Sequence, residues 1–174
     1  MKKIWNDPIY KSVIVLTAIC LVVSALLAVT NLATAPVIER TQKQAVEQAM
    51  QEVMPTKTGF EEITDSLKTL PETVQSVYRE KGDAGYVVSL ATRSQYSSAD
   101  MLVTVGIGKD GAVCGIRITN YAESKDFGAQ YPQQYLGATA QTVQAVDSVA
   151  GVTYSSAALN GAVKDALTAV QEVQ

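Results

Sequence analysis

Apolar residues form one uninterrupted run near the N-terminus. Between Ser12 and Ile38 the chain carries no charged residue, and the centre of this stretch reads VIVLTAICLVVSALLAV. A helix needs about 20 apolar residues to cross the hydrocarbon core of a bilayer, and this run is long enough. A core helix of a soluble domain would show a polar face, which is missing here. The pattern predicts one transmembrane helix over residues 12–35.

Three other interpretations of this run remain open. A cleaved signal peptide has an apolar region of roughly 7–15 residues before a small-x-small site. Ala33-Thr34-Ala35 fits such a site, but the run is too long. A lipoprotein would be processed at Cys20, yet bulky Ile19 precedes that cysteine. The third interpretation, a buried helix of this length in a soluble protein, would be rare.

Basic residues predict the orientation of the span. More of them precede the apolar run than follow it: Lys2, Lys3 and Lys11 against Arg40 and Lys43. Loops rich in Lys and Arg stay in the cytoplasm, so residues 1–11 are expected there. The domain that follows the span is then expected on the extracytoplasmic face of the cytoplasmic membrane.

Residues 36–73 are predicted to form a helical linker and a loop. Residues 39–53 (ERTQKQAVEQAMQEV) predict a helix that either continues the membrane helix or leaves it at Pro36. Met54-Pro55 is expected to end this helix, because proline disfavours a helical residue before it. The following stretch, residues 55–73, is expected to be mostly loop with a short strand or turn.

Four segments rich in Val, Ile and Tyr then predict a sheet: residues 74–78, 86–91, 101–107 and 112–119. The clearest connection is Gly108-Lys109-Asp110-Gly111, which predicts a hairpin. Gly106, Gly108 and Gly111 are interpreted as turn glycines, because no helix follows them to form a phosphate loop.

The C-terminal third predicts helices against this sheet. A short helix is expected around residues 130–136 and a further strand over residues 143–149. From Ser156 onward, apolar residues recur at spacings of four, four and three: Leu159, Val163, Leu167 and Val170. The predicted fold class is α+β, an antiparallel sheet packed with helices over residues 74–174, tethered by one span.

Composition excludes several classes of function. The chain has no histidine and no CxxC pair, which argues against zinc sites, His-ligated haem and Ser-His-Asp catalysis. Cys20 lies in the predicted span and Cys114 in a predicted strand, so we expect no disulfide between them. A net charge of −3 without a basic stripe argues against nucleic acid. No metal site is expected.

The junction before the last helix reads DSVAGVTYSS, residues 147–156. Serine is a favoured helix N-cap, which is one interpretation of Ser155 and Ser156. A helix N-terminus is also a site for phosphate, and Gly151 would let a bulky ligand approach the backbone. Thr153 lies too early to serve as a cap. This junction therefore has the parts of an anion site with a hydroxyl beside it.

The same stretch resembles the flavinylation signature of the FMN-binding domain family: an Asp, two or three variable residues, then Ser/Thr-Gly-Ala-Ser/Thr. Asp147 matches the acidic residue, Gly151 the glycine and Thr153 the acceptor. In that family the acceptor hydroxyl is joined to the phosphate of FMN through a phosphoester. Ala150 and Val152 stand where Ser or Thr and Ala are usual.

Other segments carry the resemblance further. TNLATAPVI, residues 30–38, is similar to the membrane-exit segment of the G subunit of Rnf-type ion-translocating ferredoxin:NAD oxidoreductases. VTVGIGKDGAVCGIRITNYAES, residues 103–124, resembles the hairpin core of that family. ESKDFG, residues 123–128, matches a loop that usually reads ETPGLG, with Lys125 and Asp126 in place of Pro-Gly.

The resemblance implies a membrane-anchored electron carrier with no catalytic residue of its own. FMN would be attached by a separate flavin transferase that uses FAD and a divalent metal. The chain would work with flavin- and iron–sulfur-bearing membrane subunits in a complex that moves Na⁺ or H⁺. The expected cofactor-binding residues are Thr153, Gly151, Val152, Tyr154, Ser155, Ser156, Asp147, Glu123, Ser124, Phe127 and Gly128.

Three alternatives stay open. One is a component like the C subunit of the sodium-pumping NADH:quinone oxidoreductase, which shares the pattern but is usually a longer chain. The second is a flavinylated domain that serves another extracytosolic reductase. The third is a membrane-tethered binding or scaffold domain without a cofactor, in which Thr153 is a turn residue.

Overall fold

A computed structural model describes residues 8–67, 69–95, 97, 99–121, 128 and 130–173. The chain divides into two units, Met1–Gln44 and Ala45–Gln174. The helices and strands follow in this order: α1 (Pro8–Val53), β1 (Phe60–Glu62), η2 (Thr64–Ser66), β2 (Val74–Glu80), β3 (Gly85–Thr92), β4 (Met101–Gly108), β5 (Val113–Asn120), η3 (Pro132–Tyr135), η4 (Val143–Ala145) and α2 (Thr153–Gln171).

The first unit is formed by most of helix α1, which continues through Pro36 without a break. Its segment Lys11–Val37 has a mean hydropathy of 2.8 and is long and apolar enough to cross a membrane. The hydroxyls of Thr17, Thr30 and Thr34 each donate to the carbonyl four residues earlier, at 2.9 Å. These bonds satisfy the three threonine hydroxyls inside the helix, as a bilayer requires.

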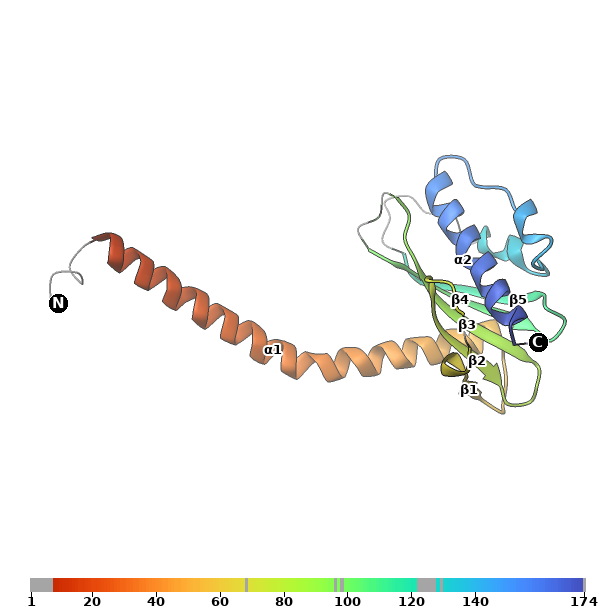
Figure 1. The fold of residues 1–174 in the computed structure, drawn as a ribbon, viewed down its shortest axis with the longest axis horizontal. Helices are drawn as coiled ribbons and strands as arrows, with labels where there is room; N and C mark the ends of the chain where they lie inside the picture. The colour runs from red at the N-terminus through yellow and green to blue at the C-terminus, as the bar shows by residue number, and fades with distance from the viewer. Residues whose placement is uncertain are drawn as a thin grey trace. The chain divides into compact units, whose positions relative to one another are not determined.

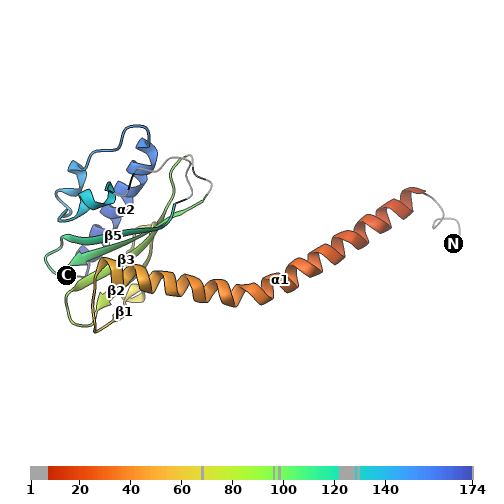
Figure 2. The ribbon, with the colours of Figure 1, turned by 180° about the vertical axis from the view of Figure 1, so that it is seen from behind.

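The second unit is an antiparallel sheet of five strands in the order β1-β2-β3-β4-β5 (Figures 1 and 2). Each strand pairs with its neighbours in sequence, so the sheet needs no crossover connection. The β4–β5 turn contains Gly111 with φ +74°, as the predicted hairpin requires. The predicted α+β class and all four predicted strands are confirmed.

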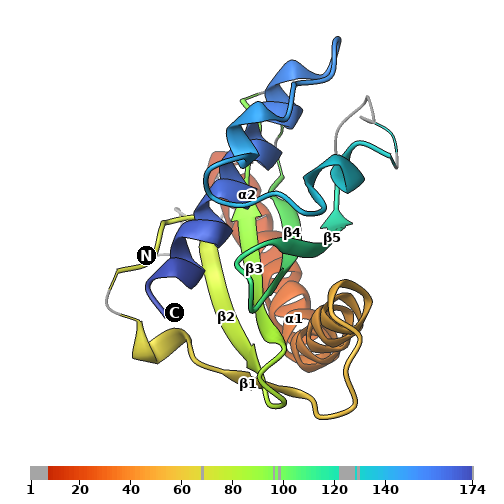
Figure 3. The same ribbon diagram turned by 90° about the vertical axis from the view of Figure 1, so that its right-hand side faces the viewer.

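Helices cover both faces of the sheet (Figure 3). On one face, α2 packs Leu159, Val163 and Leu167 against Val88 of β3 and Val105 of β4. This is the apolar stripe expected from the sequence. On the other face lies the Ala45–Val53 end of α1, in a smaller cluster of four buried side chains: Met50, Val53, Met54 and Val87. The helix ends at Val53, as expected from Met54-Pro55.

Gly106 is not a turn residue, which corrects the sequence-based interpretation. It lies within β4, opposite Gly115 of β5. A Cβ atom on Gly106 would lie 2.8 Å from the carbonyl oxygen of Val53, and one on Gly115 only 2.3 Å from it. The two glycines therefore allow the end of α1 to approach the sheet backbone.

The strand predicted over residues 143–149 is wrong. Residues 143–145 form the short helix η4, and the chain then runs irregularly to α2. Asn160 of α2 donates its side-chain amide to the carbonyls of Val143 and Val146, both at 3.3 Å. These carbonyls bond to a helix side chain and not to a neighbouring strand. The predicted short helix around residues 130–136 is present as η3.

Candidate functional site

Three connections meet at one end of the sheet. Thr92, the last residue of β3, pairs with Met101, the first residue of β4, and Leu102 pairs with Asn120, the last residue of β5. The hydroxyl of Thr92 donates to the carbonyl of Ala158, in the second turn of α2, at 3.5 Å. The β3–β4 connection, the end of β5 and the start of α2 therefore lie at the same end of the domain.

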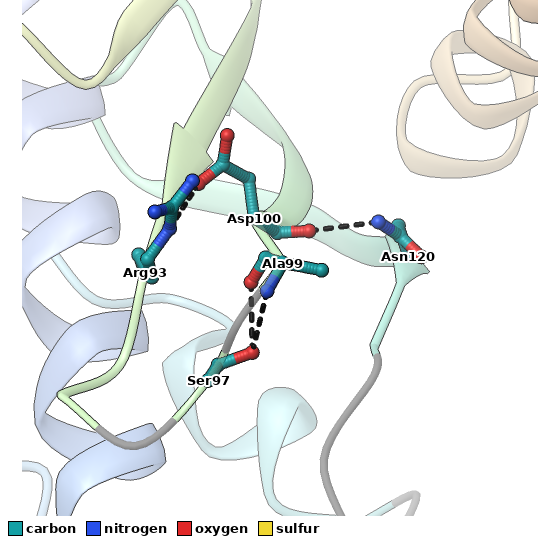
Figure 4. A network of polar contacts seen from close by, with 5 residues as sticks. All are labelled: Arg93, Ser97, Ala99, Asp100 and Asn120. Carbon is teal, nitrogen blue, oxygen red and sulfur yellow. Dashed lines mark hydrogen bonds and ion pairs between the residues drawn. The ribbon is translucent and has the colours of Figure 1, made fainter. Parts of the chain in front are cut away.

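A polar network fixes the β3–β4 connection (Figure 4). Arg93 Nε lies 2.7 Å from Asp100 Oδ1, and the Asn120 side-chain amide donates to the Asp100 carbonyl at 2.8 Å. The Ser97 hydroxyl donates to the carbonyl of Ala99 at 2.8 Å. Asn120 is the last residue of β5, so the network ties the end of β5 to the start of β4.

The residues before α2 form a tight turn. The Val152 amide donates to the Val149 carbonyl at 3.2 Å, and Gly151 at the third position has φ +87°. A β-turn of type II needs such a positive φ at this position, which favours glycine. A Cβ atom on Gly151 would meet nothing within 4 Å. We call residues 149–152 the acceptor turn, because Thr153 follows it directly.

Helix α2 begins at Thr153, two or three residues earlier than expected. Val152 occupies the N-cap position and makes no side-chain cap bond. The expectation that Ser155 or Ser156 caps the helix is therefore wrong. Both serines lie inside the first turn and are buried, at 2% and 0% exposure. The helix continues back to Thr153 because the Ser156 amide bonds to the Val152 carbonyl at 3.0 Å.

Thr153 is exposed, and its hydroxyl makes no hydrogen bond to any residue that the structure describes. Its own N–H has no carbonyl within the helix to bond, because it belongs to the first turn. The positive end of the helix dipole lies at the same place. A phosphate bonded to this hydroxyl would therefore lie in a favourable field, with open space beside Gly151 to receive it.

The other predicted residues have different environments. Asp147 is exposed and lies in the irregular stretch before the acceptor turn. Tyr154 follows the acceptor and is 51% exposed. Val152 packs part of its side chain against the main core, so its bulk is directed away from solvent. Gly128 is exposed with φ +79°. The predicted contacts Glu123, Ser124 and Phe127 lie outside the described residues.

Two residues near this site were not expected from the sequence. Asn160, in the middle of α2, ties the η4 segment to the helix through its two bonds to backbone carbonyls. Asn160 is half-buried, and an amide residue directly after Leu159 of the apolar stripe is the one sequence signal that could have revealed it. Ser94, two residues after the end of β3, is 3% exposed, and its hydroxyl has no hydrogen-bond partner in the described part of the chain. Nothing in the sequence distinguishes Ser94 from the other serines of that connection.

Two buried tyrosines lie at the two ends of η3. The hydroxyls of Tyr131 and Tyr135 lie 3.1 Å apart, and the two rings meet edge to face with centroids 5.8 Å apart. Burial and the bond to Tyr131 raise the pKa of Tyr135 above its usual value, so it stays neutral at physiological pH. The pair supports the fold. Within the described residues, no cluster of three or more metal-ligating side chains occurs.

Comparisons with known proteins identify the family of this chain. Residues 1–53 match the family model described as the RnfG N-terminal region, and residues 96–168 match the FMN-binding domain. The chain is also similar to the G subunit of the Na(+)-translocating ferredoxin:NAD(+) oxidoreductase complex of Acetobacterium woodii. The two are 30% identical over 149 residues, which cover 76% of this chain and 72% of that relative.

Proposed function

This chain belongs to the family of G subunits of Rnf-type electron-transport complexes, and we propose that it carries FMN covalently on Thr153. Its FMN-binding domain and the apolar helix segment Lys11–Val37 fit a membrane-anchored flavin carrier. The observation that carries the proposal is the hydroxyl of Thr153 at the first residue of α2, which is exposed and makes no hydrogen bond to any described residue.

The attachment needs a second enzyme. A threonine hydroxyl is a weak nucleophile by itself, so a flavin transferase must supply a base and neutralise the charge of the phosphates. In the step we propose, Thr153 Oγ bonds to the FMN phosphorus of FAD, and the bond to AMP breaks. AMP leaves, and the hydroxyl proton passes to the base of the transferase. FAD and a divalent metal on the transferase are the required co-reactants.

When bound, FMN would supply one- and two-electron redox chemistry, and this chain would supply its attachment and position. The first turn of α2 would hold the phosphate near the positive end of the helix. The network around Asp100 holds the β3–β4 connection and the end of β5 at the same end of the sheet. The stretch 123–128 follows that anchored end, which supports the proposal that it lies beside the flavin ring.

The surrounding complex follows from the family. We propose residues 12–35 as the membrane span, residues 1–11 as the cytoplasmic end and residues 74–174 as the FMN-binding domain on the extracytoplasmic face. Other flavin- and iron–sulfur-bearing membrane subunits would exchange electrons with the flavin. Electron flow from ferredoxin to NAD would drive translocation of Na⁺ or H⁺, and Na⁺ is the ion named for the Acetobacterium relative.

The test is the flavin fluorescence of the denatured protein. The full chain is co-expressed with a flavin transferase, separated on a denaturing gel and viewed under ultraviolet light. We expect a fluorescent band for the natural chain and for Thr153→Ser, and none for Thr153→Ala. Thr168→Ala is the matched control, because Thr168 is an exposed threonine on the same helix. Fluorescence that survives in Thr153→Ala excludes Thr153 as the acceptor, and a natural chain without flavin favours the scaffold alternative.

A further inference from the structure

We propose that Ser156 is the positioning residue of the acceptor turn: its buried hydroxyl joins the two ends of that turn and so sets the rate at which Thr153 receives FMN. The inference rests on the proposed function, since it needs flavin transfer to Thr153. Ser156 is distinct from a phosphate ligand, because its side chain is fully buried and its hydroxyl already bonds within the chain.

The Ser156 hydroxyl makes two hydrogen bonds. It accepts the Val149 amide at 3.2 Å and donates to the Val152 carbonyl at 2.9 Å. Val149 and Val152 are the first and last residues of the acceptor turn, which their own backbone bond already closes. A serine hydroxyl has one donor and two acceptor positions, so one side chain can bond both ends at once. The turn is thus held from inside the helix that follows it.

This bond pattern positions the nucleophile. Thr153 is bonded covalently to Val152, so a change in the direction of the Val152 carbonyl turns the Thr153 backbone with it. Transfer of a phosphoryl group needs the attacking oxygen in line with the leaving group, and a misplacement near 1 Å can cost about 100-fold in rate. Loss of the Val149 bond frees that end of the turn. The hydroxyl of Thr153 would then sample more orientations.

An ordinary helix serine would not have this effect. Serine and threonine inside helices commonly donate to the carbonyl four residues earlier. Thr168 makes that bond, to Lys164 at 2.9 Å, and makes no second one within the described part of the chain. Ser156 makes the same type of bond and also accepts the Val149 amide. Thr168→Ala is therefore the matched control, since it removes only the common bond.

The experiment measures the rate of flavin transfer to the full chain in mild detergent, with excess transferase and FAD. We expect Ser156→Ala to slow transfer about 10- to 100-fold and Thr168→Ala to leave the rate unchanged. Hydrogen exchange gives a second readout. The Val149 amide should exchange faster in Ser156→Ala, while the core amides of β4 keep their protection.

A second variant strains the same turn with the hydroxyl intact. Gly151→Ala forces an ordinary side chain into positive φ, although the added Cβ meets no atom within 4 Å. We expect it to slow transfer as well, and the double variant with Ser156→Ala to be little slower than either single one. Residues that act through one shared feature give such non-additive effects.

Three results would overturn the proposal. The first is a rate of flavin transfer in Ser156→Ala equal to that of the natural chain, together with faster exchange of the Val149 amide. The bond to Val149 would then be real but without effect on transfer. The second is unchanged Val149 exchange, because the bond would then be absent. The third is a double variant whose loss is the product of the two single losses. A natural chain that takes no flavin would instead refute the proposed function, so the two failures are distinguishable.

Discussion

A Cβ atom added to Gly115 should separate the end of α1 from the sheet. The ideal Cβ would lie 2.3 Å from the Val53 carbonyl oxygen, 2.6 Å from its Cα and 2.8 Å from its carbonyl carbon. These three atoms are backbone and cannot rotate away. Ordinary contact begins near 3.4 Å, so the helix end must shift by about 1 Å or more. Gly115→Ala therefore acts on packing and not on chain flexibility.

The size of the effect follows from what that shift disturbs. Met50, Val53 and Met54 cover Val87 on this face of the sheet. Overpacking of a filled core costs about 1–3 kcal/mol of the free energy of unfolding. For a domain of this size, 1 kcal/mol corresponds to roughly 4 °C in the melting temperature. We expect Gly115→Ala to lower the melting temperature by about 4–12 °C.

Gly161→Ala is the matched control, because the same methyl group should have the opposite effect. Gly161 lies inside α2, is exposed, and a Cβ there would meet nothing within 4 Å. Alanine in a helix interior is favoured over glycine by about 0.5–1 kcal/mol, so stability should rise. The assay is thermal unfolding of the full chain in mild detergent, followed by circular dichroism. Equal shifts in the two variants would refute the close packing of α1 on β5.

Three further outcomes are expected. Gly151→Asn should receive flavin faster than Gly151→Ala in the transferase assay, since asparagine tolerates positive φ better; the reverse order would show that space and not φ matters. Asn160→Ala should lower the free energy of unfolding by about 1–3 kcal/mol in urea titration, because the carbonyls of Val143 and Val146 lose their bonds to the Asn160 amide; no change would contradict those bonds. Hydrogen bonds from the hydroxyls of Thr56 and Thr58 lower the pKa of Glu80 from 4.5 to about 2, so its contribution to stability is complete above pH 4.5 and is lost as pH falls toward 2. Glu80→Gln should flatten that part of the stability curve measured by urea titration, and an unchanged slope would refute the assignment.

The sheet could be predicted from the sequence because its signals are local. Alternating Val and Ile residues and the Asp110-Gly111 turn specify the β4–β5 hairpin with only short-range information. The apolar run of the first helix is equally local, since only its length and lack of charge matter.

The errors arose where distant residues decide the structure. The stretch 143–149 has strand-like residues, but the side-chain amide of Asn160 bonds to two of its carbonyls. Among the described elements, no strand of the sheet pairs with this stretch. Gly106 lies beside turn glycines in sequence, yet its role depends on Val53, far away along the chain. Such contacts leave no periodic pattern to detect.

The candidate site was predicted in part. Thr153 and Gly151 are identified by a short motif, and the structure gives Gly151 the positive φ that explains its presence. The role of Ser156 was not visible, because one serine in a first turn resembles any N-cap. Only the burial of its hydroxyl and the bond to Val149 distinguish it.

Peptide mass analysis of the full chain, co-expressed with a flavin transferase, tests the central proposal most directly. After proteolysis, the peptide that contains Thr153 should carry the added mass of one FMN less one water, and fragmentation should place that mass on Thr153. A chain that binds FMN but leaves this peptide unmodified, or carries the mass on another residue, would contradict the proposal.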